Sequence, residues 1–423
     1  MTDTIFALSS GLPPAGIAIV RVSGPATGNA LSALAGQLPQ PRQAALCRFR
    51  HPSSGETLDR GLALWFPGPA SVTGEDLAEL HLHGGRAVVA AALDALSGLE
   101  GLRPAQAGEF TRRAFENGRI DLAEAEGLAD LLAAETESQR QAALALAEGG
   151  LGHKVAAWQS SLLRCAALVE AQLDFSDESE VEAGHISHTD EHISALEAEM
   201  AALLAAPPAE RLRDGVRVVL AGPPNSGKSS LFNMLVGREA AIVTEIAGTT
   251  RDRIEAPVTL GGVPLLLTDT AGLRDEAEDQ VERIGIARTG EALAEADMIL
   301  WLGEAILAPK GAILIASKCD LGKSAPGFAV SVYTGEGLPG LRQLILERAQ
   351  ALLPKPGALA LNARHRAILH DVATELRDAA QARDPLITAE HLRYARARLD
   401  ALTGRAGVED MLDALFGAFC IGK

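Results

Sequence analysis

Alternation of hydrophobic and polar positions governs the first part of the chain and predicts a sheet. Short runs rich in aliphatic and β-branched residues occur at 4–8, 17–22, 46–50, 62–66 and 77–83. Glycine, proline or serine follows each run, as expected where strands end. Helical spacing replaces the alternation at about 25–34 and 87–96. We therefore expect an α+β domain over residues 1–117.

A helical pattern begins near Ile120 and continues to about residue 204. Its apolar positions recur at spacings of three and four, at Leu151, Val155, Trp158, Leu162, Cys165, Val169 and Leu173. A second helical pattern runs from about 364 to 419. Both stretches have apolar stripes that need partners, so we expect one discontinuous helical domain formed by residues 118–210 and 356–423.

The intervening residues 211–355 have a different pattern and form a predicted inserted domain. Apolar strand-like runs occur at 216–221, 263–268, 298–302 and 312–316. Strands that alternate with helices are typical of a parallel sheet, and we expect a doubly wound α/β fold here. The chain as a whole is thus predicted to combine α/β and all-α domains.

Composition narrows the range of functions. The 423 residues are 47% hydrophobic and 22% charged, which is typical of a globular protein. Aromatic residues make up 4% and the net charge is −17, so broad contact with nucleic acid would need a local basic patch or a basic partner. The cysteines are scattered, and neither a signal peptide nor a membrane span is expected. These observations favour a cytoplasmic protein.

One motif indicates nucleotide binding. The run from Gly222 to Ser229 reads Gly-Pro-Pro-Asn-Ser-Gly-Lys-Ser, and it lies between a predicted strand and a predicted helix. In this context the pattern is typical of a phosphate-binding loop, or P-loop, whose backbone N–H groups surround phosphate oxygens. Lys228 is predicted to contact the β- and γ-phosphates, and the Ser229 hydroxyl is predicted to ligate Mg²⁺.

Later segments favour GTP over other nucleotides. A threonine-containing segment, 244–252, can complete the Mg²⁺ shell, and a strand ends in Asp269-Thr270-Ala271-Gly272. Asp320 can accept hydrogen bonds from the N1–H and N2–H₂ groups of guanine, which adenine does not offer in this arrangement. The run beginning Ser331-Val332-Tyr333 has the form of a loop that closes over the base.

The predicted GTP contacts share a position at the ends of these strands or in the loops that follow them. They are Asn225, Ser226, Gly227, Lys228, Ser229, Ser230, Thr244, Glu245, Ile246, Ala247, Gly248, Thr249, Thr250, Asp269, Thr270, Ala271, Gly272, Ser317, Lys318, Asp320, Ser331, Val332 and Tyr333. The predicted Mg²⁺ ligands are Ser229 and Thr250.

Two departures from the usual GTPase pattern affect this prediction. Ser317 stands where GTPases usually have asparagine, so we expect a weaker bridge between the base-binding loop and the P-loop. Only residues 303–311 separate two probable parallel strands, which is fewer than a helical crossover needs. The nucleotide domain is therefore expected to be trimmed.

The chain resembles a bacterial family, the MnmE (TrmE) tRNA modification GTPases. Within the nucleotide domain the resemblance rests on 222–229, 248–252, 269–273 and 281–285. Elsewhere it rests on 20–24, on Gly108-Glu109-Phe110-Thr111-Arg112-Arg113-Ala114-Phe115 and on the ending Cys420-Ile421-Gly422-Lys423. The family has a folate-binding dimerisation domain, a helical domain and an inserted GTPase domain, which agrees with the predicted organisation.

The resemblance also implies a catalytic arrangement. Leu273 follows the Asp-Thr-Ala-Gly run, where a leucine cannot orient water as a glutamine would. In the family, K⁺ neutralises the developing charge and is bound when two GTPase domains dimerise. Its ligands map to Asn225, Thr244, Ile246 and Thr249, and the glutamate that positions water maps to Glu282. The implied catalytic residues are therefore Glu282, Asn225 and Lys228.

A second implied site binds a tetrahydrofolate derivative. The resemblance assigns it to Arg21, Glu79, Arg119 and Lys423, with Cys420 as a possible reactive thiol. It further implies a homodimer and a heterotetramer with an FAD-dependent partner protein. Together they would add an aminomethyl-type group, such as carboxymethylaminomethyl, to C5 of the wobble uridine of certain tRNAs.

Alternatives remain open at the level of sequence. A GTPase of ribosome assembly, or a regulatory switch without one-carbon chemistry, would share the nucleotide motifs. On the strand around Glu79, alternation places Glu79, His81 and His83 on one face, which is either a solvated polar face or a metal site.

Overall fold

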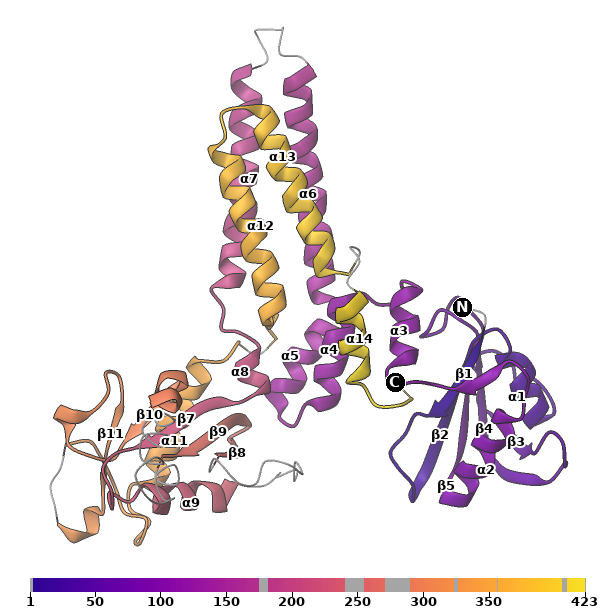
Figure 1. Cartoon of the computed structure of the whole chain (residues 1–423), viewed down its shortest axis with the longest axis horizontal. Coiled ribbons are helices and arrows are strands. Elements are labelled where there is room, and N and C mark those ends of the chain that lie inside the picture. The colour runs from indigo at the N-terminus through magenta and orange to yellow at the C-terminus, as the bar shows by residue number, and fades with distance from the viewer. Residues whose placement is uncertain are drawn as a thin grey trace, which may run out of the picture. The chain divides into compact units, whose positions relative to one another are not determined.

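A computed structural model of the chain describes residues 3–174, 182–239, 255–270, 290–322, 326–355, 357–404 and 409–422 (Figure 1). The chain divides into two compact units. The first contains residues 1–129 and 400–423, and the second contains residues 130–399.

The first unit is built on a six-stranded sheet in the order β3-β4-β5-β2-β1-β6. Its strands are β1 (Thr4–Leu8), β2 (Ala15–Ser23), β3 (Ala45–Arg50), β4 (Thr57–Phe66), β5 (Leu77–Gly84) and β6 (Leu102–Pro104). Helices α1 (Thr27–Ala35) and α2 (Arg86–Ser97) lie along the sheet, and buried side chains such as Phe49 and Leu80 join them to it. The predicted strands are confirmed, and β6 was missed because three residues carry no periodic signal.

The C-terminal segment completes this unit. Helices α3 (Glu109–Glu116), α4 (Leu122–Ala133) and α14 (Glu409–Gly417) supply a small core in which the Phe115 and Phe416 rings lie 6.2 Å apart. Ile421 then forms an antiparallel bridge with Ala107. The last described residues therefore pack against the chain that leads into α3.

The second unit contains a helical part made of segments from both sides of the inserted domain. Helices α6 (Gly150–Asp174) and α7 (Glu182–Leu204) precede the insertion, and α12 (Ala363–Gln381) and α13 (Pro385–Leu402) follow it. Helix α12 packs along α7, and α7 packs along α6 (Figure 1). The apolar stripe predicted on α6 is confirmed, since Leu151, Val155, Trp158, Leu162, Cys165 and Val169 are at most 1% exposed.

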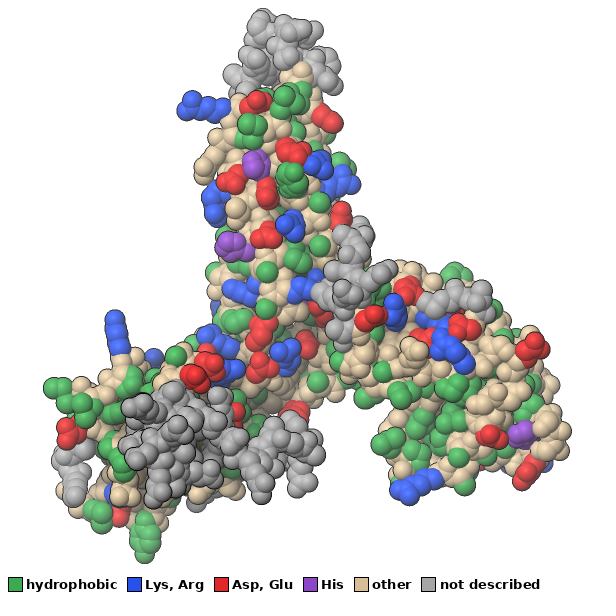
Figure 2. Space-filling view, viewed as in Figure 1, with side chains coloured by type: hydrophobic (Ala, Val, Ile, Leu, Met, Phe, Trp, Pro, Cys, Tyr) green, Lys and Arg blue, Asp and Glu red, His purple; other side chains and the backbone are tan. Residues whose placement is uncertain are grey.

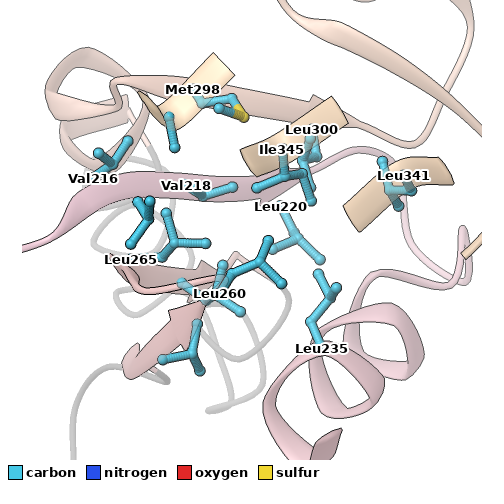
Figure 3. Close-up of a cluster of buried hydrophobic side chains, with 14 of the residues drawn as sticks. Val216, Val218, Leu220, Leu235, Leu260, Leu265, Met298, Leu300, Leu341 and Ile345 are labelled. Atoms are coloured by element: carbon cyan, nitrogen blue, oxygen red, sulfur yellow. The ribbon is translucent and has the colours of Figure 1, made fainter. Parts of the chain in front are cut away.

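The nucleotide domain is a second six-stranded sheet, in the order β12-β11-β10-β7-β9-β8. Its elements are α8 (Glu210–Arg213), β7 (Val216–Ala221), α9 (Lys228–Glu239), β8 (Glu255–Leu260), β9 (Val263–Asp269), β10 (Met298–Trp301), β11 (Ile313–Ser317), β12 (Phe328–Val330) and α11 (Leu338–Ala351). All strand pairs are parallel except β8 with β9. Figure 3 shows Leu235 of α9 and Ile345 of α11 directed at Val218 and Leu220 of β7.

The shortened crossover is a feature of the fold. Strands β10 and β11 pair in parallel, and only the 3₁₀ turn Ala305–Leu307 lies between them. Ile306 on this turn is 88% exposed. The sequence prediction of a trimmed domain is thus confirmed, whereas the edge strand β8 was not predicted. Pro257 within β8 obscures the strand signal, and proline is tolerated there because the strand is at the edge.

Candidate functional site

The P-loop follows β7 and has the backbone that phosphate binding requires. Gly222, Asn225 and Gly227 have positive φ angles of 147°, 59° and 98°. A Cβ atom at Gly222 would lie 2.5 Å from the carbonyl oxygen of Leu302, so only glycine fits there. The loop ends at the N-terminus of α9, where unpaired N–H groups favour an anion.

Two charged side chains are buried at this edge of the sheet. Lys228 is 5% exposed and its Nζ donates a 2.9 Å hydrogen bond to the carbonyl oxygen of Pro223, within the P-loop. Asp269, the last residue of β9, is 1% exposed. Strands β7 and β9 are adjacent and parallel, so Asp269 lies at the same edge of the sheet as the P-loop, which leads from β7 to Lys228. This is where ligands bind in open α/β sheets.

The neighbouring hydroxyl groups have different environments. Ser229 and Ser230 lie in the first turn of α9 and are exposed, which leaves Ser229 accessible as a Mg²⁺ ligand. Thr270 is buried, and its Oγ1 donates a 2.9 Å hydrogen bond to the carbonyl oxygen of Leu220. Thr270 therefore fixes the segment after β9 against β7.

Ser317, where the sequence predicts a weakened bridge to the P-loop, contacts the P-loop backbone. Ser317 Oγ donates a 2.6 Å hydrogen bond to the carbonyl oxygen of Ser226. Lys318 Nζ donates a 3.0 Å hydrogen bond to the carbonyl oxygen of Asn225. The serine side chain thus reaches the P-loop backbone, and Lys318, which adopts a left-handed conformation (φ 58°), reaches the adjacent carbonyl.

The predicted base-binding residues lie on adjacent loops. Asp320 is exposed on the 3₁₀ turn Cys319–Leu321 after β11. Ser331 follows β12 and is 1% exposed, and its Oγ accepts a hydrogen bond from the backbone N–H of Thr334. Tyr333 is 94% exposed. Since Ser317 pairs with Val330 across β11 and β12, these two loops are neighbours at the same edge as the P-loop.

Part of the predicted site lies outside the described residues. This applies to Thr244, Glu245, Ile246, Ala247, Gly248, Thr249 and Thr250, to Ala271 and Gly272, to Glu282 and to Lys423.

In the first unit, Arg21 and Glu79 face each other across β2 and β5. Arg21 Nη2 and Nε donate hydrogen bonds of 2.9 and 3.2 Å to Glu79 Oε1, and His81 Nε2 lies 3.3 Å from Oε2. Burial alone would raise the pKa of Glu79, but the Arg21 and His81 interactions outweigh it and hold that pKa below its usual range. The Arg21 guanidinium also lies 5.8 Å from the centre of the Phe110 ring.

Arg119 and Cys420 lie in the same unit. Arg119 is exposed beside Gly74, where an added Cβ would lie 3.2 Å from Arg119 Cγ. Cys420 is an exposed free thiol that directly precedes the bridge between Ile421 and Ala107. That bridge is three residues before Phe110, so the C-terminal segment and Arg21 both approach the start of α3.

The sequence analysis did not predict a buried ionic cluster around Arg113 in the first unit. Arg113 is fully buried and donates hydrogen bonds to the carboxylates of Asp3, Glu75 and Glu109. Arg103 donates to Glu109 and Asp3. The motif around Glu109 and Arg113 was recognised only as part of a family resemblance, although its charges at a spacing of four indicate a helical ion pair.

The histidines on β5 have carboxylate partners. His81 contacts Glu79, and His83 Nδ1 lies 2.8 Å from Asp59 Oδ1. Among the described residues, no group of three or more histidine, cysteine or acidic side chains could hold a metal ion. Within the same described ranges, no helix is both long enough and apolar enough to cross a membrane.

Two family models and several known proteins match this chain. The family model of the MnmE helical domain matches residues 122–420, and that of the GTP-binding protein TrmE N-terminus matches residues 4–119. A tRNA modification GTPase MnmE of Rhizorhabdus wittichii is 58% identical over 427 residues, covering 100% of this chain and 97% of that protein. The same-named protein of Novosphingobium aromaticivorans is 56% identical, and both chains are covered completely.

Among solved structures, the G domain of the Thermotoga maritima FeoB iron transporter is 28% identical. It matches 32% of this chain and 99% of its own, with a TM-score of 0.24. With both family models matched and relatives more than half identical along the entire chain, the protein belongs to the MnmE family of tRNA modification GTPases.

Proposed function

We propose that the chain is a K⁺-stimulated GTPase that, with an FAD-dependent partner protein, adds an aminomethyl-type group to C5 of the wobble uridine of certain tRNAs. A tetrahydrofolate derivative supplies the one-carbon unit. The active assembly contains a homodimer of this chain and forms a heterotetramer with the partner. GTP hydrolysis drives rearrangement of this assembly.

The hydrogen bonds from Ser317 and Lys318 to the P-loop are the observation that carries the nucleotide part. They join the loop that carries Asp320 to the backbone that surrounds the phosphates. Guanine recognition by Asp320 and phosphate binding by Lys228 are therefore linked mechanically. The base, the phosphates and Mg²⁺ at Ser229 fit along one edge of the sheet.

The K⁺ site is proposed at Asn225, whose side chain is exposed and whose left-handed backbone places it at the turn of the P-loop. Asn225 would hold K⁺ together with Thr244, Ile246 and Thr249, and the ion would supply positive charge to neutralise the charge that develops on the phosphates during hydrolysis. Glu282 positions the attacking water. Lys228 contacts the phosphates.

The folate site is proposed at Arg21, Glu79 and Arg119, with Lys423 and Cys420 at the C-terminal end. A carboxylate such as Glu79 can accept two hydrogen bonds from the amine edge of a pterin. The homodimer contact is proposed over β2, where Ile17 is 63% exposed. In Figure 2, hydrophobic side chains gather on this unit over β2.

The nucleotide proposal is tested by GTP turnover in KCl and in NaCl at equal ionic strength. Wild-type protein is expected to hydrolyse GTP faster in KCl. Glu282→Ala should bind GTP normally and hydrolyse it very slowly in both salts. Equal wild-type rates in the two salts would exclude the Asn225 site, and undiminished turnover by Glu282→Ala would remove that residue from the mechanism.

A further inference from the structure

The outer face of the first sheet carries an unusual pair of positive charges. Arg48 on β3 and Arg60 on β4 are direct cross-strand partners. Side chains in such positions have Cβ atoms about 4.5–5.5 Å apart, and like charges there destabilise the sheet. Both residues are exposed, and neither has a hydrogen-bond or ion-pair partner for its side chain among the residues that the structure describes.

This pair lies on the same face as the candidate folate site. Cys47 and Phe49, which flank Arg48, are buried against the helices, so Arg48 and Arg60 point to the opposite face. The register continues from Leu46 and Leu62 to His81 and Ile19, and from Leu64 to Glu79 and Arg21. The cross-strand partner of Glu79 on β4 is Leu64. Arg60 precedes Leu64 by four residues on the same strand, which corresponds to a distance of about 13 Å given the rise per residue of a strand.

The surface between the two charged sites is largely apolar. Leu62 and Leu46 are 39% and 62% exposed in the intervening row, and His81 is partly exposed beside them. An aromatic ring can lie on such a surface. The order along the face is thus a carboxylate that suits a heterocycle, an apolar floor and then two unpaired guanidinium groups.

We propose that Arg48 and Arg60 bind the γ-linked glutamate tail of a polyglutamylated folate whose pterin is held at Glu79. This inference rests on the proposed folate function of the same face. The order of groups in a folate is a hydrogen-bonding pterin, a benzoyl ring and a chain of carboxylates, which matches the order on the sheet. Each guanidinium can receive a carboxylate bidentately.

The net charge of the whole protein supports the proposal that Arg48 and Arg60 bind an anionic tail. A chain with a net charge of −17 repels polyanions, so unpaired arginines are the places where an anionic tail can be held. The repulsion between Arg48 and Arg60 is relieved when carboxylates lie between them. Binding of the tail therefore stabilises a contact that is unfavourable in the free protein.

The test compares tetrahydropteroyl-monoglutamate with tetrahydropteroyl-pentaglutamate by calorimetry on the full chain. Wild-type protein should bind the pentaglutamate about five- to thirtyfold more tightly, since each exposed charge pair contributes modestly. The Arg48→Ala/Arg60→Ala double variant should lose this gain, and its affinity for the monoglutamate should fall less than its affinity for the pentaglutamate. Arg48→Lys/Arg60→Lys should keep part of the gain, and Arg393→Ala on α13 should keep all of it.

Several outcomes would overturn the proposal, and they are distinguishable. Equal wild-type affinity for the two ligands, or an unchanged gain in the double variant, would exclude the tail site while leaving the folate function intact. Absence of binding by either folate would refute both. If the double variant loses binding to an anticodon stem-loop RNA but keeps the pentaglutamate gain, Arg48 and Arg60 bind RNA and not the folate tail. Finally, Arg60→Thr should melt at or slightly above the wild-type Tm, and a lower Tm would make the pair structural.

Discussion

The hydrogen bond between Ser317 and the P-loop should contribute measurably to nucleotide affinity. Ser317 Oγ donates to the carbonyl oxygen of Ser226 at 2.6 Å in a partly buried position. Ser317→Ala removes the donor without changing the backbone, so the carbonyl loses its side-chain partner. A neutral hydrogen bond of this kind contributes about 1 kcal/mol, which corresponds to roughly a fivefold change in an equilibrium constant.

The assay is displacement of a fluorescent GDP analogue from the full chain by unlabelled GDP and GTP. We expect about a three- to tenfold higher Kd for Ser317→Ala, with most of the change in the dissociation rate. Ser161→Ala is a matched control, because Ser161 Oγ donates to the carbonyl oxygen of Ala157 on the distant helix α6. Unchanged affinity in Ser317→Ala, or an equal loss in Ser161→Ala, would refute the proposed bridge.

Other predictions concern the first unit. Arg113→Met removes the guanidinium that pairs with the partly buried Glu75 and should lower the free energy of unfolding by about 3–5 kcal/mol. At the more exposed neighbouring position, Arg112→Met should cost less than about 1 kcal/mol. Equal losses in urea melts would refute this. Gly108 has φ 65° and an added Cβ would lie 2.2 Å from a carbonyl oxygen of α14. Gly108→Ala should therefore make the C-terminal segment sensitive to carboxypeptidase, whereas Gly118→Ala, at φ 64° with open space, should not. Because the pKa of Glu79 is lowered in the fold, its contribution is present above its ordinary pKa of 4.5 and is lost as the pH falls through the folded value. Wild type should lose stability relative to Glu79→Gln in that acid range, and the opposite trend would contradict the ion pair.

Sequence reasoning located elements whose signal is local. The stripe from Leu151 to Val169 specifies one buried face of α6, and the strand–loop–helix order around Lys228 specifies the P-loop. Both signals depend on spacing within one segment, so tertiary structure did not alter them. The short crossover between β10 and β11 could also be predicted, because the number of residues between the two strands is read directly from the sequence.

Features that depend on contacts between distant segments could not be predicted. The reach of Ser317 to Ser226 depends on how the loop after β11 approaches the P-loop, which spacing does not encode. The burial of Arg113 depends on carboxylates from Asp3 and Glu75, far apart in the chain. Likewise, Arg48 and Arg60 became a pair only through the register of β3 with β4.

Coupling between nucleotide binding and tRNA modification is the central claim, and one measurement tests it most directly. Wobble uridines are quantified by nucleoside mass spectrometry in a deletion strain that carries wild-type protein or Lys228→Ala. We predict that C5-aminomethyl-type uridines disappear in the deletion strain, return with wild-type protein and stay absent with Lys228→Ala. Fully modified wobble uridines in the deletion strain, or full restoration by Lys228→Ala, would contradict the claim.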